Sequence, residues 1–194
     1  MDFLSKKFKN EITTEDRYDE NFSKAISLLI IEQQISFKAA LIIKERFKSL
    51  VKNLRNEDFI LLDIRSIQKI GVSKRKAEYI KNCYLFFLEN NINFASLKDK
   101  EVISLLCTIK GVGEWTAQMF LIFILKRKDV FSFKDIALIN SIKKNYLLSD
   151  MKEIDLLQKS WAPYRTAASL LLWKSIEEKC FFSQKESLLF HENP

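Results

Sequence analysis

The chain has 194 residues, 47% of them hydrophobic, with a formal net charge of +7 and only three Gly and two Pro. A chain of this length is long enough for one full-sized domain or two small lobes with a genuine core. The positive charge favours a polyanionic partner, with nucleic acid the first candidate. The scattered Cys83, Cys107 and Cys180 and the single histidine, His191, argue against a zinc site, a cysteine-bound iron–sulfur cluster and a histidine base.

The amino-terminal segment and the longest apolar runs bear on localisation. Met1–Asn10 is charged and lacks the apolar core of a secretory signal, and runs such as Met119–Leu125 are too short to span a bilayer. We therefore expect a cytoplasmic protein without a membrane partner. In that compartment the three cysteines are expected to be reduced and packed in the core.

Apolar periodicity predicts about eight helices in one compact unit. The clearest of them, in chain order, are Tyr18–Gln34, Ser36–Leu50, Lys74–Asn90, Leu97–Leu106, Gly113–Leu125, Asp135–Tyr146 and Pro163–Lys179. Ser73 is the expected cap of the third helix, and Pro163 suits the first turn of the last. Gly113–Leu125 is apolar almost all round, which places it at the centre of the core.

Two of the three glycines, Gly111 and Gly113, form a turn between two predicted helices. A turn without side chains allows a phosphate to approach the backbone, and the amides there and at the start of the next helix can bind it. A G-x-G triplet alone equally fits an ordinary tight turn.

The residues around this turn are more specific. Residues 109–117 read Ile-Lys-Gly-Val-Gly-Glu-Trp-Thr-Ala, and they follow Ile-Glu-Gln-Gln-Ile-Ser at 31–36 and Ile-Gly-Val-Ser-x-x-Lys-Ala at 70–77. Asp129-Val130-Phe131, Asp135 and the Trp161–Trp173 segment come next. In this order the motifs resemble the helix-hairpin-helix DNA glycosylases, specifically the bacterial 3-methyladenine glycosylases type II, over about residues 16–175.

The resemblance implies an all-α fold in which two helical lobes flank a cleft for DNA and the damaged base. The whole chain, 1–194, would form one such domain. Larger bacterial enzymes of the family carry an additional amino-terminal β lobe, for which this chain has no room. It would be a minimal, all-helical version, with a monomer as the default.

Hydrolysis of a glycosidic bond develops positive charge on the deoxyribose, which a fixed carboxylate can stabilise while orienting or activating water. The resemblance assigns this role to Asp135. Asp135 also precedes the apolar-periodic stretch that begins at Ile136, so it fits an ordinary helix N-cap. The two roles can coexist. Asp129 competes, but it lies among Lys126, Arg127 and Lys128, where surface ion pairs are expected.

In related bifunctional glycosylases a catalytic lysine occupies the position of Trp115. Without that amine we expect simple hydrolysis to an abasic site and no strand cleavage. Lys110 is the main lysine that could undermine this. The resemblance places Trp115, Trp173, Met119 and Ile136 around the base. Indole faces suit cationic alkylated purines such as 3-methyladenine, although tryptophans on apolar helices are more often simply core.

The remaining predicted contacts concern DNA. The resemblance takes the side chain that fills the gap left by a flipped base from the Gln33–Gln34 joint, with Gln34 favoured; the alternative is that both glutamines only cap helices. Backbone contacts are expected from Lys110, Gly111, Val112, Gly113, Thr116 and Arg165. The cluster Lys74, Arg75 and Lys76 is a further candidate.

The family implies no organic cofactor. Its hairpins can bind a structural Na⁺ or K⁺ through main-chain carbonyls, here those of Cys107, Ile109 and Val112. Three functions remain open: a monofunctional glycosylase acting on duplex DNA with a damaged base, a bifunctional glycosylase with lyase activity on another lesion, and a hairpin module that only binds DNA. A binding module needs the glycines but not Asp135.

Overall fold

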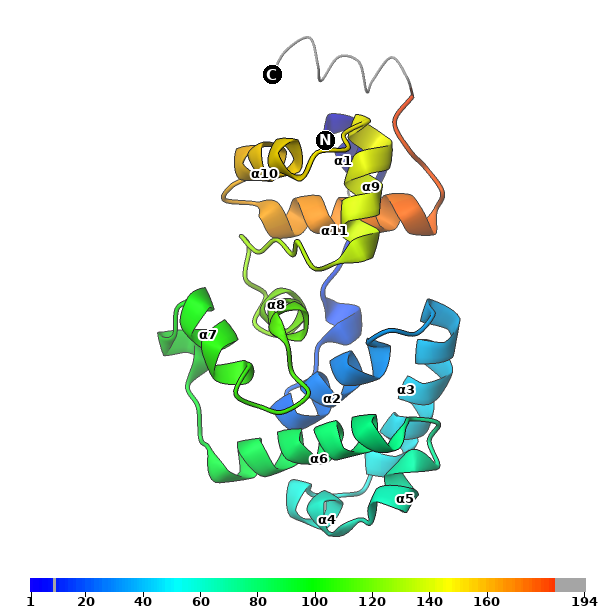
Figure 1. Cartoon of the computed structure of the whole chain (residues 1–194), viewed down its shortest axis with the longest axis vertical. Coiled ribbons are helices and arrows are strands. Elements are labelled where there is room, and N and C mark those ends of the chain that lie inside the picture. Colours follow the sequence, from blue (N-terminus) through cyan, green and yellow to red (C-terminus); the bar gives the residue numbers. More distant parts are fainter. Residues whose placement is uncertain (9, 184–194) are drawn as a thin grey trace. The chain divides into compact units, whose positions relative to one another are not determined.

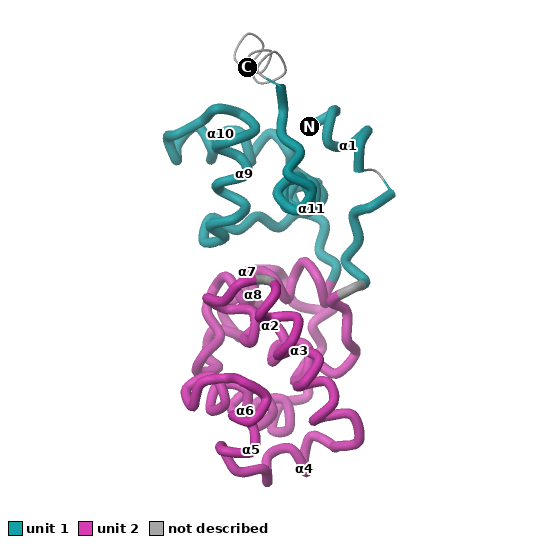
Figure 2. The backbone as a smooth tube through the Cα atoms, turned by 90° about the vertical axis from the view of Figure 1, so that its right-hand side faces the viewer, with its two compact units in different colours: residues 1–16, 126–194 teal, residues 17–125 magenta. Residues whose placement is uncertain are grey.

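The computed structural model describes residues 1–8 and 10–183 and divides the chain into two compact units, residues 1–16 with 126–194 and residues 17–125 (Figure 2). The described residues are helical and contain no strand, as the all-α prediction required (Figure 1). None of their helices is long and apolar enough to cross a membrane. His191 lies outside the described residues.

The unit of residues 17–125 is built around two long helices, α2 (Phe22–Glu32) and α6 (Lys74–Glu89), that pack along each other. Helix α2 also packs against α3 (Phe37–Val51) and α8 (Glu114–Phe123), and α7 (Asp99–Leu106) packs against α8. Two short helices, α4 (Asn56–Leu61) and α5 (Ile64–Gln68), cover α6. Single turns of 3₁₀ helix lie at η1 (Glu15–Arg17) and η2 (Phe94–Ser96).

Aromatic side chains join these helices. The ring centroids of Phe22 and Phe94 are 5.1 Å apart, and those of Phe94 and Phe120 are 5.2 Å apart. A second group stacks Phe59 on Tyr84 with a centroid distance of 3.9 Å. Residues 116–123 of α8 are all buried, which agrees with the all-round apolar pattern of that helix. These contacts fix α8, and hence the turn that precedes it.

The other unit packs α9 (Ile136–Tyr146) and the amino-terminal α1 (Asp2–Phe8) against α11 (Arg165–Glu177). Its apolar core includes Leu138, Ile142 and Leu172, together with residues of α10 (Met151–Ser160). A buried polar network also ties α9 to α11. Ser141 Oγ donates to the Leu172 carbonyl at 2.8 Å, and Asn145 Nδ2 donates to Ser175 Oγ at 3.2 Å.

Side-chain caps explain where several helices begin. Ser73 accepts the Lys76 amide at 3.2 Å and starts α6, as predicted, and Ser36 accepts the Ala39 amide at 3.3 Å and starts α3. The prediction for Pro163 is wrong: α11 begins at Arg165 after Tyr164 as N-cap. Helices α1, α4, α5 and α10 were not predicted as such. The first three are short, and α10 carries only a narrow apolar stripe.

The cysteines only partly follow the prediction. Cys83 is buried, and burial raises the pKa of its thiol. Cys107 is exposed, so the expectation of a core-packed cysteine is wrong for this residue, whereas Cys180 is partly exposed and packs against the core of its unit. Cys107 is the C-cap of α7, where the chain leaves the core to enter the glycine turn.

Candidate active site

The glycine turn between α7 and α8 forms a tight hairpin. The Val112 amide donates to the Ile109 carbonyl at 2.9 Å, and Gly111 takes a φ of +106°, which favours glycine. A Cβ at Gly111 would lie 2.1 Å from Cγ of Tyr79, so a side chain is excluded there by packing as well. The hairpin is therefore pressed against α6 at Gly111.

Gly113 differs from Gly111 in what surrounds it. Its φ of −104° is open to other residues, and a Cβ there would meet nothing within 4 Å. Gly113 is the N-cap of α8, and no side chain caps this helix start. The amides and the dipole of a helix N-terminus favour an anion. Packing within the described residues does not require glycine at this position. A phosphate backbone that approached closely would require the absence of a side chain there.

Gln33 is held inside the unit. Its Nε2 donates to the Gly111 carbonyl at 3.1 Å and to Thr116 Oγ1 at 2.8 Å. Thr116 is only 1% exposed, so its hydroxyl serves this bond. Both residues were predicted to contact DNA. In the protein without DNA, their side chains join the end of α2 to the hairpin and the start of α8.

Gln34 is exposed and has a φ of +56°. A non-glycine residue in the left-handed region is uncommon, and such conformations concentrate at functional sites. Gln34 lies between Gln33, the C-cap of α2, and Ser36, the N-cap of α3. The joint therefore presents the Gln34 side chain to solvent, between Gln33, which the hairpin holds, and Ser36, which caps α3.

The basic cluster at the start of α6 is divided. Lys74 and Arg75 are exposed. Lys76 Nζ donates to the carbonyls of Ile31 and Gln33 at 2.8 and 2.6 Å. Partial burial lowers the pKa of its ammonium. The expectation of a phosphate contact at Lys76 is thus replaced by a contact with the end of α2, which the sequence did not reveal.

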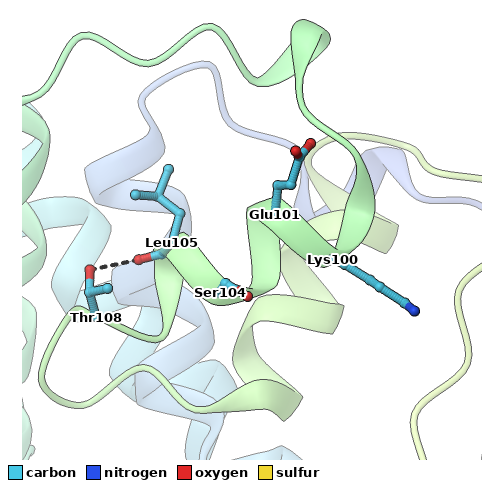
Figure 3. A pocket seen from close by; sticks show the side chains of 5 residues that line it. All are labelled: Lys100, Glu101, Ser104, Leu105 and Thr108. Atoms are coloured by element: carbon cyan, nitrogen blue, oxygen red, sulfur yellow. Dashed lines mark hydrogen bonds between the residues drawn. The ribbon is translucent and has the colours of Figure 1, made fainter.

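Lys110 is exposed at the hairpin, and its carbonyl accepts a hydrogen bond from Asn82 Nδ2 at 3.3 Å. A shallow hollow lies beside the hairpin on α7 (Figure 3). It is lined by Lys100, Glu101, Ser104, Leu105 and Thr108. None of these was predicted as a site residue. The Thr108 hydroxyl donates a hydrogen bond to the Leu105 carbonyl at 2.7 Å.

The second group of predicted residues lies around Asp135, the N-cap of α9. Its Oδ1 accepts the Leu138 amide at 2.7 Å and Trp173 Nε1 at 3.2 Å, and the residue is 8% exposed. The helix start favours a negative charge here. Two donors from different helices therefore hold the carboxylate in one pose. The sequence did not indicate that Trp173 would be one of these donors.

The predicted base-pocket residues differ in exposure. Trp115 and Trp173 are half-buried. Ile136, next to Asp135, is 76% exposed, an unusual position for a large apolar side chain, whereas Met119 is 1% exposed. Within the unit that contains Asp135, the Trp173 indole and the exposed Ile136 lie next to the fixed carboxylate, and an apolar ring could contact such a surface.

Asp129 and Arg165 bind each other. Arg165 Nε and Nη2 donate to the two carboxylate oxygens of Asp129 at 2.6 and 2.7 Å, and Nη1 donates to Gln158 Oε1 at 3.3 Å. Asp129 thus forms the expected ion pair, but with a residue of α11 and not with the neighbouring cations. Arg165 was predicted to contact DNA, and a phosphate would have to compete with this bidentate pair.

Comparison with known proteins identifies relatives. A family model described as HhH-GPD superfamily base excision DNA repair protein matches residues 28–165. The Bacillus subtilis protein YfjP is 31% identical over 188 residues, 90% of this chain and 66% of its own length. A Saccharomyces cerevisiae DNA-3-methyladenine glycosylase is 36% identical over 149 residues, 70% of this chain and 50% of its own. The chain thus spans between half and two-thirds of these two curated relatives.

A solved structure extends the likeness to the fold. The Schizosaccharomyces pombe 3-methyladenine DNA glycosylase, in complex with abasic DNA, superposes with a TM-score of 0.84 at 28% identity. The match covers 94% of this chain and 93% of that one.

The two hairpin glycines should differ in how strongly alanine destabilises the protein. We expect Gly111→Ala to lower the free energy of unfolding by about 2–4 kcal/mol, because a positive φ and the Tyr79 ring both oppose a Cβ. Gly113→Ala should lower it by less than about 1 kcal/mol, the cost of a poorer N-cap. Urea unfolding followed by circular dichroism measures both. Equal losses would contradict the assignment of Gly113 to an external contact.

The Asp129–Arg165 pair gives a pH prediction. The guanidinium holds the pKa of the Asp129 carboxyl below its usual range, so the stabilisation is complete above the unfolded-state pKa and is lost as pH falls through the folded-state pKa. We expect Asp129→Asn to lower the free energy of unfolding by about 0.5–1 kcal/mol at neutral pH, and this difference to shrink as the pH falls below the unfolded-state pKa of the carboxyl. Asp155→Asn, in the exposed pair with Lys159, is the control and should cost less. A pH-independent difference would mean that the charge is irrelevant.

Proposed function

Because the chain belongs to the HhH-GPD superfamily of base excision DNA repair proteins, we propose that it is a monofunctional DNA glycosylase. The proposed activity is hydrolytic removal of alkylated purines, 3-methyladenine first, from duplex DNA, leaving an abasic site. The observation that carries the proposal is the buried Asp135 carboxylate, held by the Leu138 amide and the Trp173 indole. A module that only binds DNA has no use for a carboxylate fixed in this way.

The proposed reaction begins when the nucleotide rotates out of the stack, which costs about a few kcal/mol. The amides of Gly111 and Gly113 and those at the start of α8 bind the backbone phosphate, and Gln34 enters the gap that the base leaves. Lys110 adds charge at the hairpin. Damage that weakens base pairing lowers the cost of opening, so it contributes to selection.

The glycosidic bond then breaks with positive charge developing on the sugar. Asp135 faces that charge without rearrangement, because its pose is set beforehand, and it orients the attacking water. An N-alkylated purine is already cationic and a good leaving group, so moderate stabilisation is sufficient. Trp115 and Trp173 provide ring faces for the cationic base, and Ile136 provides apolar contact.

A structural Na⁺ or K⁺ at the hairpin is part of the proposal. The carbonyls of Cys107, Ile109 and Val112 would hold it, and neutral carbonyl oxygens suit a hard monovalent ion. The Val112 amide donates to the Ile109 carbonyl at 2.9 Å, so two of these three residues lie in one closed turn. The ion would join the hairpin to a phosphate and take no part in bond cleavage. No organic cofactor is proposed.

The proposed setting follows from the activity. The partner is double-stranded DNA with a damaged base, and the protein acts as a monomer that encloses one flipped nucleotide. The absence of a membrane-spanning helix among the described residues is compatible with a cytoplasmic enzyme, associated with the nucleoid if the source is bacterial.

The catalytic assignment is tested with Asp135→Asn. Asparagine keeps an oxygen for the Leu138 amide and is an equally good N-cap, so the variant removes charge and little else. We expect the single-turnover release of 3-methyladenine from duplex DNA to fall by about 100-fold at matched DNA binding. Asp150→Asn, at the N-cap of α10, is the control and should keep the wild-type rate.

Equal release by wild type and Asp135→Asn would show that the carboxylate is not catalytic. Failure of both to release a base, with DNA binding intact, would favour another lesion or a protein that only binds DNA.

The absence of lyase activity is tested by borohydride. With an indole at position 115 and no amine there, we expect no trapped protein–DNA adduct and no strand cleavage before alkali treatment. A trapped adduct in the wild type that is lost in Lys110→Gln would identify Lys110 as a nucleophile and make the enzyme bifunctional.

A further inference from the structure

The joint between α2 and α3 is held from inside by Lys76. The ammonium donates to the carbonyls of both Ile31 and Gln33, at 2.8 and 2.6 Å, where α2 ends. A cation at a helix C-terminus is electrostatically favourable, and these carbonyls have no partner within the helix. Lys76 therefore fixes the main chain on the amino-terminal side of Gln34.

The same joint is held by the hairpin. Gln33 Nε2 donates to the Gly111 carbonyl at 3.1 Å and to the hydroxyl of the buried Thr116 at 2.8 Å. Hydrogen bonds that are shielded from water are stronger and harder to replace. Gln33 is thus fixed twice, by its carbonyl to Lys76 and by its side chain to the hairpin.

Helix α6 contacts both the joint between α2 and α3 and the glycine hairpin. Lys76 reaches the joint, Tyr79 lies against Gly111, and Asn82 Nδ2 donates to the Lys110 carbonyl at 3.3 Å. These residues are spaced by three along α6 and so share one side of it. One helix therefore sets the distance between the turn that grips the backbone and the joint that carries Gln34.

We propose that Lys76 and Gln33 are positioning residues that lock the exposed Gln34 to the phosphate-gripping hairpin. The left-handed backbone at Gln34 persists only while its surroundings determine it, and Lys76 and Gln33 provide those surroundings. The position of the inserted side chain and the grip on the backbone then depend on the same hydrogen bonds. This rests on the proposed function, because Gln34 acts only when a base leaves the stack.

The test is a double-mutant cycle on DNA binding. The Kd for a duplex with a tetrahydrofuran abasic analogue is measured by fluorescence anisotropy, with and without Gln34→Ala, in three backgrounds. The backgrounds are wild type, Lys76→Met and the matched control Lys81→Met. Lys81 also lies on α6 and donates to a helix-end carbonyl, that of Leu62 at 2.7 Å, far along the chain from the joint.

We expect Gln34→Ala to weaken binding about tenfold in the wild type and in Lys81→Met, and less than about twofold in Lys76→Met, because Gln34 is already misplaced there. A general loss of stability would leave the effect of Gln34→Ala unchanged, so it does not mimic this result. An equal effect in all three backgrounds, or no effect in the wild type, would overturn the proposal.

A second variant covers a failure of Lys76→Met to fold. Thr116→Val keeps the shape of a buried side chain and removes one of the two hairpin acceptors of Gln33. It should also reduce the effect of Gln34→Ala, to about threefold or less; an undiminished tenfold effect would overturn the proposal. Release of 3-methyladenine by the wild type is measured in parallel. Coupling without release would refute the proposed function alone, release without coupling would refute the positioning role alone, and absence of binding would refute both.

Discussion

The contact between Gly111 and the Tyr79 ring is the constraint on which the hairpin depends. A Cβ at Gly111 would lie 2.1 Å from the ring, so the turn can press against α6 only because that side chain is absent. This approach brings the Gly111 carbonyl and Thr116 within reach of Gln33. The hydrogen bonds that hold Gln33 beside Gln34 therefore depend on the absence of a Cβ at Gly111.

The Asp135 region solves a different physical problem. A carboxylate that is proposed to stabilise developing positive charge must be held in one position although it is largely buried. The Leu138 amide and the Trp173 indole both donate to its Oδ1. The Ser141–Ser175 hydrogen bond of 2.9 Å joins α9 to α11. This contact helps to keep the Trp173 indole on α11 within hydrogen-bond distance of the Asp135 carboxylate. A helix cap and a catalytic group are therefore compatible in one residue.

In both units, polar side chains that were predicted to contact DNA also form hydrogen bonds or ion pairs within the protein. Gln33, Thr116, Lys76 and Arg165 are types that commonly contact phosphates, and each has an internal partner here. The exposed groups that remain for DNA are fewer: Gln34, Lys74, Arg75 and Lys110, with the backbone at Gly113.

The sequence by itself determined the all-α class, most long helices, the glycine turn and the start of α9 at Asp135, because periodicity, capping residues and local motifs are encoded within a few residues. Short helices such as α4 and α5 escaped, since five or six residues carry too little periodic signal. Only the tertiary structure decided which polar side chains face inward. Lys74 and Lys76 look alike in sequence, yet one is exposed and the other binds two carbonyls of α2. The difference arises because Lys76 binds the carbonyl of Gln33, which lies 43 residues earlier in the chain. A local sequence pattern cannot encode such a contact.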